Sequence, residues 1–367
     1  MTKKALIIGN SVRNIACSAR RAGYIVYALD RFGDVDMQKC ANKAQLLGNM
    51  SELQDMVESF GDVDAMILGP GFENLELKNT LNNTPEIANE AGDKSKLPRK
   101  LNSLGIPHPK TEEMDKADGL RFPLMIKPRA GSGGMRNIIV RNEAELDNFR
   151  NLNDPHDFIA QEFIEGLPCS ASLISTGDDS SVVAINEQLI GTPWLTRIPF
   201  AYCGNITPFH TKFREEIVQY AKQIAIEFKL LGSNGVDFMV TDNGVQVIEI
   251  NPRFQGSLDT VELSTGVNIF DAHVRSFEGE LPHSRESTCF AAKTIIFAEK
   301  ELVITKEISD TLVKCMDKGR AADIPRRGIT IKPDEPITTM LATARTQKMV
   351  LYKARRSSQL IKRRTEV

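Results

Sequence analysis

Short apolar runs alternate with an amphipathic stretch at the start of the chain. Residues 5–9 and 24–30 are rich in Ala, Leu, Ile, Val and Tyr, and the stretch between them has helical spacing to about residue 22. This β-α-β order predicts that a parallel sheet begins the chain. A third apolar run, within residues 62–68, precedes a Gly-Pro-Gly loop and predicts a further strand of this α/β region.

Later segments change between strand-like and helical periods. Residues 122–127 and 158–164 are typical of strands, and residues 142–150 predict a helix with acidic residues in its first turn. The turn Thr241-Asp242-Asn243-Gly244 separates two apolar runs, residues 235–240 and 247–251, and predicts a β-hairpin. Apolar residues at helical spacing in residues 212–230 predict a helix that packs on a core: Phe213, Ile217, Tyr220, Ile224 and Phe228.

The predicted hairpin brings acidic residues together. Asp237 lies on its first strand and Glu249 on its second, and pairing would set them side by side. Asn251 projects to the same side as Glu249, because side chains alternate along a strand. Two acids and an amide favour a divalent cation, Mg²⁺ or Mn²⁺, and Arg253 follows directly. The alternative interpretation is an edge strand with a solvated polar face.

A glycine-rich loop follows the apolar run that ends in Lys127. Gly131, Ser132, Gly133 and Gly134 would let backbone N–H groups approach phosphate oxygens, and Lys127 adds a positive charge. Neither G-x-x-x-x-G-K-[ST] nor G-x-G-x-x-G is present, so a flexible hairpin is the alternative. A dinucleotide site after the first strand is disfavoured, because that loop has one glycine of the fingerprint although Asp30 ends the second strand.

The order of these parts resembles the ATP-grasp superfamily. The matching segments are Gly92-Asp93-Lys94, Ile126-Lys127-Pro128, the glycine-rich loop, Gln161-Glu162-Phe163-Ile164-Glu165-Gly166, Asp237, and Glu249-Ile250-Asn251-Pro252-Arg253. Within the superfamily, the chain most resembles archaeal-type ATP-grasp proteins that are described as ATP-dependent carboligases related to biotin carboxylase. The resemblance rests on two shared segments, Gln161 to Gly166 and Tyr202 to Pro208. The resemblance spans roughly residues 1 to 350 and is specific as an ordered set.

The resemblance implies an α/β fold built from an amino-terminal Rossmann-like pre-ATP-grasp domain and two ATP-grasp lobes. The expected boundaries are residues 1–91 for the first domain and 92–166 for the small lobe with the glycine-rich loop. Residues 167–367 would form the large lobe, with the metal site and a carboxy-terminal subdomain. The implied cofactors are ATP and one or two Mg²⁺ ions.

Carried over residue by residue, the resemblance also implies roles. Lys94 and Lys127 would bind the α- and β-phosphates, with Lys96 as the competitor of Lys94. The loop residues Gly131, Ser132, Gly133 and Gly134 would cover the nucleotide, Gln161 and Ile164 would frame the adenine, and Glu165 would contact the ribose. Asp237, Glu249 and Asn251 would hold the metal, and Arg253 would act with Lys127 in catalysis by steadying the transferred phosphoryl group.

Three functions are compatible with this resemblance. The favoured one is a carboxylate–amine ligase that forms an amide through an acyl phosphate on small-molecule substrates, either amino-acid-like or coenzyme precursors. A biotin-carboxylase-like enzyme is the first alternative, but such enzymes continue with Gln-Val-Glu where this chain has Gln255-Gly256-Ser257, and the general base is therefore absent. A non-catalytic nucleotide-binding regulator is the second, and the intact acidic set with Arg253 argues against it.

Bulk properties indicate an intracellular enzyme. The chain has 367 residues, which is more than one typical hydrophobic core needs. Its residues are 41% hydrophobic and 26% charged, with a net charge of −2. No apolar run could span a bilayer and no leader is evident, so a cytoplasmic location without membrane contact is expected. The six cysteines lack a C-x-x-C pair and predict reduced thiols. His210 and His273 are interpreted as packing or surface residues.

The carboxy-terminal residues 348–364 are strongly basic. Such a segment could neutralise nucleic-acid phosphates, but only Tyr352 accompanies it as a stacking platform, and the whole chain is slightly acidic. A solvated helix face is therefore the favoured interpretation. The expected partners are small-molecule substrates and not nucleic acid, and a homodimer is left open.

Overall fold

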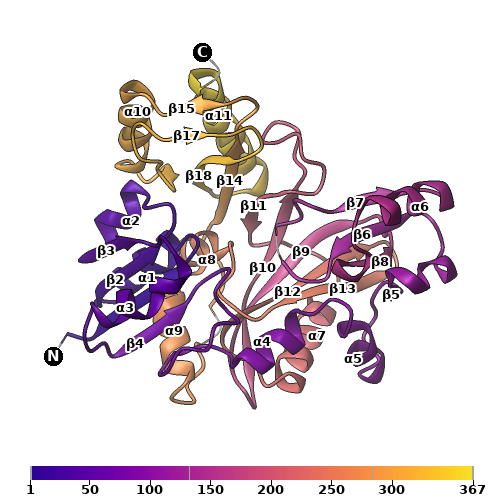
Figure 1. Cartoon of the computed structure of the whole chain (residues 1–367). Helices are drawn as coiled ribbons and strands as arrows, with labels where there is room; N and C mark the ends of the chain where they lie inside the picture. The colour runs from indigo at the N-terminus through magenta and orange to yellow at the C-terminus, as the bar shows by residue number, and fades with distance from the viewer. Residues whose placement is uncertain (1, 132, 284, 366–367) are drawn as a thin grey trace.

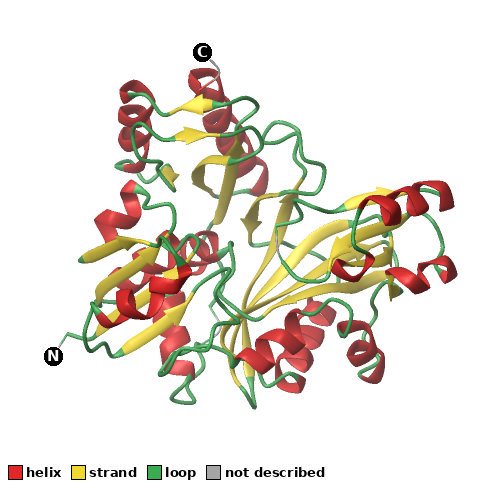
Figure 2. Cartoon of the chain, viewed as in Figure 1, coloured by secondary structure: helices red, strands yellow, loops and turns green. Residues whose placement is uncertain are grey.

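The computed structural model describes residues 2–131, 133–283 and 285–365 and contains mixed α/β structure in four sheets. Three lobes surround an eight-stranded sheet: the amino-terminal domain, a small lobe and a carboxy-terminal subdomain (Figure 1). Helices cover the outer faces of these sheets, and the strands converge towards the middle of the molecule (Figure 2). The α/β fold class expected from the sequence is confirmed.

The amino-terminal sheet is parallel and has the order β3-β2-β1-β4. Its strands are β1 (Lys4–Gly9), β2 (Ile25–Asp30), β3 (Lys43–Leu46) and β4 (Ala65–Leu68), with helices α1 (Arg13–Arg21), α2 (Val35–Cys40) and α3 (Leu53–Glu58) and the short 3₁₀ helix η1 (Met50–Glu52). Along β1, Ala5 and Ile7 face one hydrophobic core while Leu6 and Ile8 face another. Burial of both faces explains why this strand is apolar without alternation. The predicted β-α-β unit is confirmed.

The expectation that all cysteines are reduced is wrong for one pair. Cys17 on α1 and Cys40 at the end of α2 form a disulfide, with Cα atoms 5.0 Å apart. The two helices pack side by side, which brings together cysteines that are 23 residues apart in sequence. Cys169, Cys203, Cys289 and Cys315 are free, as predicted. The thiol argument for a reducing compartment therefore fails for Cys17 and Cys40.

The small lobe contains a four-stranded antiparallel sheet of order β5-β8-β6-β7. Its strands are β5 (Thr111–Glu113), β6 (Leu124–Pro128), β7 (Ile138–Val140) and β8 (Phe158–Glu162), and its helices are α6 (Glu143–Leu152), η2 (Met114–Gly119) and η3 (Pro155–Asp157). Asn142 begins α6, because its side chain accepts a hydrogen bond from the Glu145 N–H. Leu146 and Phe149 of α6 pack on Ile126 and Phe158 of the sheet, which fixes the strand that carries Lys127.

The large sheet has the order β13-β12-β9-β10-β11-β14-β18-β16. Its strands are β9 (Leu167–Thr176), β10 (Ser180–Ile190), β11 (Tyr202–Thr207), β12 (Leu231–Thr241), β13 (Gly244–Asn251), β14 (Phe290–Phe297), β16 (Ala321–Ala322) and β18 (Pro336–Ala344). Helices α4 (Pro85–Gly92), α5 (Leu97–Ser103) and α7 (Arg214–Glu227) share a hydrophobic core with it. Helix α4 crosses the expected boundary between residues 91 and 92, and the domain boundaries stay predictions.

Two helices join the large sheet to the amino-terminal domain. These are α8 (Leu258–Thr265) and α9 (Ile269–Ser276), and their residues Val261 and Phe270 share one core with Ile7 and Ile15 of the first domain. The predicted amphipathic helix is α7, which buries Ile217 and Ile224 as expected. The amino-terminal domain and the large sheet are therefore joined by one shared apolar core.

The carboxy-terminal subdomain contains β15 (Leu302–Val303), β17 (Thr330–Ile331), α10 (Lys306–Met316) and α11 (Gln347–Thr365). One face of α11 is buried, at Val350, Ala354, Ser358, Ile361 and Thr365. The basic residues of this segment are on a helix that packs on β14 and β18. No helix in the described parts of the chain is long and apolar enough to cross a membrane.

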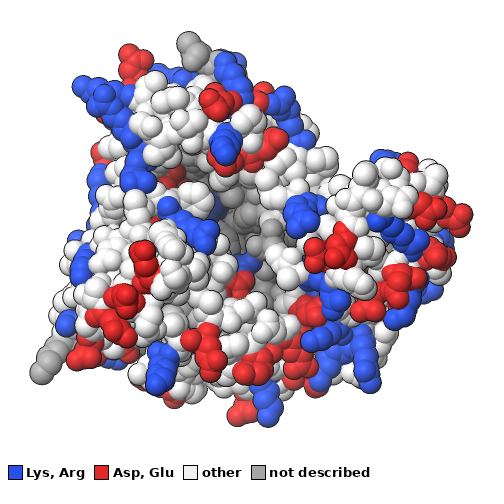
Figure 3. All heavy atoms as spheres, in the orientation of Figure 1, with Lys and Arg blue, Asp and Glu red and all other residues white. Residues whose placement is uncertain are grey.

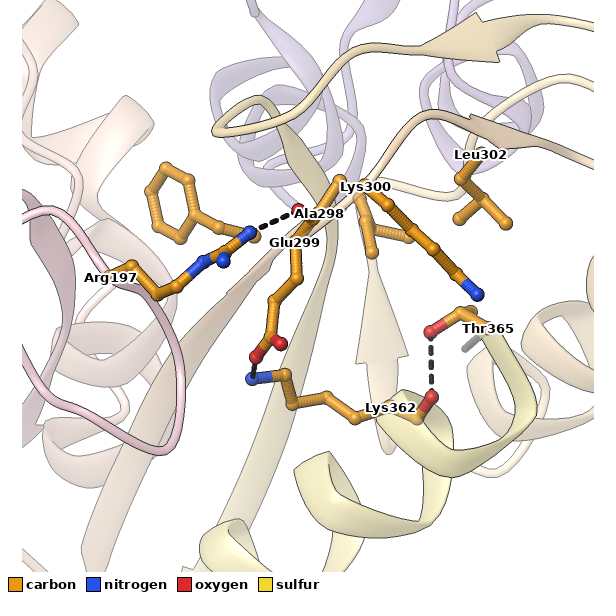
Figure 4. A pocket seen from close by; sticks show the side chains of 9 residues that line it. Arg197, Ala298, Glu299, Lys300, Leu302, Lys362 and Thr365 are labelled. Carbon is orange, nitrogen blue, oxygen red and sulfur yellow. Dashed lines mark hydrogen bonds and ion pairs between the residues drawn. The ribbon is translucent and has the colours of Figure 1, made fainter. Parts of the chain in front are cut away.

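A cavity of about 300 Å³ lies between the end of β14 and the end of α11. Lys362 Nζ lies 2.6 Å from Glu299 Oε1 at its edge, and Arg197 donates to the Glu299 backbone carbonyl (Figure 4). Phe297, Leu302 and other apolar residues complete the lining. This cavity shares no lining residue with the larger cavity described below, so it is separate from the candidate site.

His273 on α9 is a buried packing residue, as predicted. Its Nδ1 accepts the Ser233 N–H at 2.8 Å and its Nε2 lies 2.8 Å from the Leu81 carbonyl, which requires the neutral ring protonated on Nε2. Burial lowers the pKa of His273 to about 4. Between that value and the ordinary value of about 6.5, the unfolded chain binds a proton that the folded chain does not.

Folding stability should therefore fall as the pH decreases through this window. The slope is about 1.4 kcal/mol per pH unit for one group, so His273 should remove about 2 kcal/mol between roughly pH 6.5 and pH 5. Urea unfolding of the wild type and of His273→Gln at the two pH values measures the difference, with His210→Gln as the control at an exposed histidine. An equal loss of stability in wild type and His273→Gln would contradict this role.

Candidate active site

The predicted hairpin is present as β12 and β13, and Asp237 pairs directly with Glu249. The register shifts between Asp237 and Phe238, so that Ile248 is the extra residue of a β-bulge. Ile248 lines a large cavity together with both acids. The bulge therefore lies directly beside the Asp237–Glu249 pair, where the hairpin lines this cavity.

Asp237 has an unsatisfied buried oxygen. Its Oδ2 accepts a hydrogen bond from Asn251 Nδ2 at 3.2 Å, whereas Oδ1 is buried without a hydrogen-bond partner among the described residues. Burial, and after it the nearby Glu249 charge, raises the pKa of Asp237 above its ordinary value. An anion in this state is costly unless a positive group faces it.

The negative charge of Glu249 is compensated by two lysines, Lys94 and Lys127. Lys94 Nζ lies 3.2 Å from Glu249 Oε2. Burial opposes ionisation of Glu249, but Lys94 and Lys127 outweigh it and lower the pKa. Lys94 also donates to the Gly131 carbonyl at 2.9 Å, whereas Lys96 is 64% exposed and pairs with Asp93. The structure thus places Lys94, and not Lys96, beside the acidic pair.

Lys127 is buried at the end of β6 with its ammonium towards the same acids. It donates to Gln161 Oε1 at 2.7 Å, and Gln161 Nε2 donates to Thr111 at 2.9 Å. The amide oxygen of Gln161 therefore holds Lys127, while its amide nitrogen is anchored to Thr111. Gln161 is not among the residues that line the cavity. An ammonium has three donors, so two remain for a ligand.

The glycine-rich loop bends over the opening of the cavity. Gly131, Gly133 and Gly134 have positive φ angles of 110°, 81° and 69°, a conformation that other residues rarely adopt. A Cβ at Gly134 would lie 2.0 Å from the Phe200 carbonyl oxygen, and Tyr202 donates its N–H to the Gly133 carbonyl. The loop is thus pinned against the start of β11. Ser132 lies outside the described residues.

The cavity has a volume of about 690 Å³ and runs between the small lobe and the large sheet. Figure 3 shows a hollow between the lobes, with Lys and Arg side chains around it. Part of the lining is apolar and suited to a planar base, formed by Met125, Phe163, Ile164, Phe238 and Ile248. Glu165, which follows Ile164, and Lys127 also line the cavity. The volume is in the range of ligand-binding sites, and the predicted residues Lys127, Gly133, Gly134, Ile164, Glu165, Asp237, Glu249, Asn251 and Arg253 all line it.

Arg253 is anchored by the amino-terminal domain. Its Nε lies 3.1 Å from Glu73 Oε1, one Nη donates to Asn251 Oδ1 and the other to the Phe254 carbonyl, each at 3.1 Å. Glu73 follows β4 and also accepts the Gly71 N–H. Sequence reasoning missed Glu73, although its place after a strand of an open parallel sheet is where ligand sites form.

The side chains of Gln255 and Ser257 belong to a buried polar network. Ser172 donates to Gln255 Oε1 at 2.9 Å, and its Oγ lies 3.1 Å from Ser257 Oγ. A Cβ at Gly235 would lie 1.5 Å from Gln255 Nε2, so the glycine leaves the space that Gln255 occupies. The loop after Arg253 is therefore fixed from beneath, which holds the guanidinium in place.

Lys127→Ala should weaken ATP binding. A charge-assisted hydrogen bond contributes about 1.5–3 kcal/mol, so the affinity should fall roughly ten- to a hundredfold. Burial lowers the pKa of Lys127 to about 8, so wild-type affinity should also decrease as the pH rises above that value, because the neutral amine cannot hold phosphate. Calorimetry at about pH 7 and pH 9 measures both effects, with exposed Lys96→Ala as the control. Unchanged affinity in Lys127→Ala would exclude the phosphate contact.

Comparisons with known proteins bear on the domain family and the fold. The ATP-grasp domain family matches residues 91–257. An uncharacterized protein of Methanocaldococcus jannaschii is 27% identical over 363 residues, which covers 92% of this chain and 88% of the relative. Carbamoyl phosphate synthase large chains also match, and this chain spans about a quarter of their length.

Two solved structures show the fold across nearly the whole chain. The biotin carboxylase domain of Hydrogenobacter thermophilus 2-oxoglutarate carboxylase, in complex with MgADP, ADP and bicarbonate, has a TM-score of 0.75 at 18% identity, covering 96% of this chain and 88% of that chain. The L-amino acid ligase from Bacillus licheniformis has a TM-score of 0.72 at 18% identity and covers 97% of each chain. Residues 91–257 therefore match the ATP-grasp domain family, and the chain as a whole shares the fold of these two structures.

Proposed function

We propose that this protein is an ATP- and Mg²⁺-dependent ligase that joins a small-molecule carboxylate to an amine, with an acyl phosphate as the intermediate. The observation that carries the proposal is the arrangement of Asp237, Glu249, Asn251 and Arg253 along one cavity with Lys127. A site that only bound nucleotide would need the lysines and the apolar residues of the lining. The two acids and the anchored arginine add the groups that phosphoryl transfer requires.

The residues present fit Mg²⁺. Asp237 and Glu249 offer carboxylate oxygens, and the buried Asp237 Oδ1 has no other partner among the described residues. No group of three or more His, Cys, Asp and Glu that could hold a metal occurs in the described chain. Mg²⁺ is commonly held by one or two carboxylates, waters and substrate phosphates, so Asp237, Glu249 and the Asn251 amide oxygen suffice with a bound nucleotide. Bound Mg²⁺ would neutralise charge on the phosphates.

The apolar and the charged residues of the lining take different parts of the nucleotide. The adenine packs against the apolar side chains that include Ile164, with Glu165 beside the ribose. Lys127 and Lys94 then face the phosphates, and the loop glycines cover them. Gln161, which was expected to frame the adenine, instead holds Lys127 in the structure, so we assign it the role of positioning that ammonium.

The chemistry proceeds in two steps. An oxygen of the substrate carboxylate attacks the γ-phosphorus of ATP, the bond to the β-phosphate oxygen breaks, and ADP leaves. The amine then attacks the acyl carbon, loses a proton, and inorganic phosphate leaves with the bonding electrons. Arg253 faces the charge that develops in both steps, because Glu73 and Asn251 hold its guanidinium at the cavity wall.

The biotin-carboxylase-like alternative lacks support at one position. Ser257 stands where the resemblance to biotin carboxylases would require a glutamate base, and its hydroxyl is engaged with Ser172 in a buried network. A hydroxyl in that environment cannot act as a base near neutral pH. The likeness to biotin carboxylase at 18% identity is a likeness of fold, which an L-amino acid ligase shares.

A screen of carboxylate and amine pairs tests the proposal. Release of ADP and phosphate should require both an acid and an amine, and mass spectrometry should detect a product equal to their sum less water. Omitting Mg²⁺ should remove turnover. Phosphate release that is stimulated by bicarbonate and biotin, with no dependence on any acid or amine, would refute the ligase.

A further inference from the structure

Besides Arg253, the large lobe contributes a second cation to the wall of the cavity. Lys293 on β14 is 5% exposed and lines the cavity, as do Gln255, Gly256 and Ser257. Neither the nucleotide nor the metal chemistry described above uses it. Arg253 and Lys293 are the cationic residues of the described lining outside the small lobe.

Lys293 is held from behind. Its Nζ lies 3.4 Å from Asp259 Oδ2 on α8. Asp259 is itself bound by two nitrogens of Arg13, and Arg13 also contacts Asp323 at 2.8 Å and Asp36 at 3.5 Å. Residues of the amino-terminal domain, of α8 and of the carboxy-terminal subdomain thus meet at this point. One loose ion pair fixes the side chain, and an ammonium with three donors can still bind a ligand in the cavity.

The cavity that both cations line also has apolar walls. It is lined by Ile190 of β10, by Ile295 of β14, and by Pro199 and Phe200 in the loop before β11. An apolar wall accommodates a short carbon chain, while the cations at Arg253 and Lys293 attract anionic groups. Apolar walls beside two cations would have no use in a bicarbonate site, because bicarbonate has no carbon chain to bury.

We propose that Lys293 determines substrate specificity by binding a second carboxylate, so that the acid activated by this enzyme is a small dicarboxylate, with or without an amino group. The inference rests on the proposed ligase function, because it assigns the group that Arg253 faces to the reacting carboxylate. The second carboxylate stays unreacted at Lys293. Lys293 is then a binding residue for the acid and has no contact with ATP.

The test uses acids that differ by one carboxylate. Glutarate and L-glutamate are compared with butyrate and L-2-aminobutyrate, with hydroxylamine as the amine, and hydroxamate is measured. The wild type should prefer the dicarboxylates. In Lys293→Met, kcat/KM for the dicarboxylates should fall roughly ten- to a hundredfold, as expected for a lost charge-assisted contact, while KM for ATP stays unchanged.

The control separates binding from structure. Arg21→Met breaks an ion pair with Glu262 between α1 and α8, and Arg21 does not line the cavity. Lys293→Met and Arg21→Met should melt at similar temperatures, and only Lys293→Met should lose the preference. Equal use of mono- and dicarboxylates by the wild type, an undiminished preference in Lys293→Met, or losses that follow melting temperature alone would overturn the inference and leave the ligase intact.

Failure of the ligase itself gives a different result. If no acid yields hydroxamate, calorimetry of glutarate in the presence of Mg²⁺ and a non-hydrolysable ATP analogue decides the matter. Glutarate binding to the wild type and not to Lys293→Met would retain the dicarboxylate site without the ligase reaction. No binding to the wild type would overturn the site as well.

Discussion

Replacing Glu249 by glutamine should lower Mg²⁺-dependent turnover by at least about a hundredfold. The amide has the shape of the carboxylate but lacks its charge, so a metal ligand is lost and Lys94 loses its ion-pair partner at 3.2 Å. Removal of one preorganised electrostatic contact at a reacting phosphate has an effect of about 10²–10³ in kcat. Stopped assays of ADP release over a range of Mg²⁺ concentrations measure both kcat and the metal requirement.

Asp242→Asn is the matched control for Glu249→Gln. Asp242 lies in the exposed turn of the same hairpin, so the same loss of charge there should leave turnover unchanged. Melting temperatures of both variants should stay close to that of the wild type. A Glu249→Gln enzyme that turned over at the wild-type rate would show that the acidic pair does not hold the metal.

Arg253→Ala should abolish acyl-phosphate formation while ATP still binds. The guanidinium is held by Glu73 and Asn251, and we assign the adenine to the apolar side chains that include Ile164. Nucleotide affinity should therefore change by less than about threefold, whereas kcat should fall about 10²–10³-fold. Single-turnover measurement of hydroxamate, together with calorimetry of ATP binding, separates the two effects.

Two further variants show why the arginine is required. Arg253→Lys keeps the charge but loses the planar fork that binds Glu73 and Asn251, so it should recover only part of the activity. Glu73→Gln should lower kcat without changing KM for ATP, because Glu73 acts through Arg253. Full activity of Arg253→Ala would remove the arginine from the mechanism and with it the role of Glu73.

Local patterns allowed the sequence to predict the hairpin and its acids. A short turn between two apolar runs fixes the register, and the register places Asp237 opposite Glu249. The first β-α-β unit and helix α7 were predictable for the same reason, since their periods lie within a few turns of chain. The glycine-rich loop was predictable as a loop, because its glycines take conformations that other residues avoid.

Features that depend on distant contacts were not predictable. The disulfide pairs cysteines that lie on two different helices and are 23 residues apart in sequence. Glu73 comes from the amino-terminal domain and Lys293 from β14, another strand of the large sheet, and neither carries a local signal for the site. The middle strands β9, β10 and β11 also escaped the sequence analysis, because several of their polar residues are buried in a network that only the folded sheet creates, such as Asn186 and Asn205.

The placement of Gln161 and Lys94 shows the same limit at finer scale. Sequence reasoning favoured Lys94 with Lys96 as its competitor, and only the fold shows that Lys94 reaches Glu249. Gln161 belongs to a segment expected at the adenine, but strand pairing sets it opposite Met125 and next to Lys127. Position along a motif therefore gave the region of these residues, and the three-dimensional contacts gave their partners.

Trapping of the activated acid by hydroxylamine tests the central claim most directly. The wild-type enzyme with ATP, Mg²⁺, an accepted acid and hydroxylamine should form one hydroxamate for each ADP released, and bicarbonate should have no effect. Arg253→Ala should form none. ATP turnover that depends on bicarbonate and carboxylates free biotin, with no hydroxamate from any acid, would contradict the acyl-phosphate ligase.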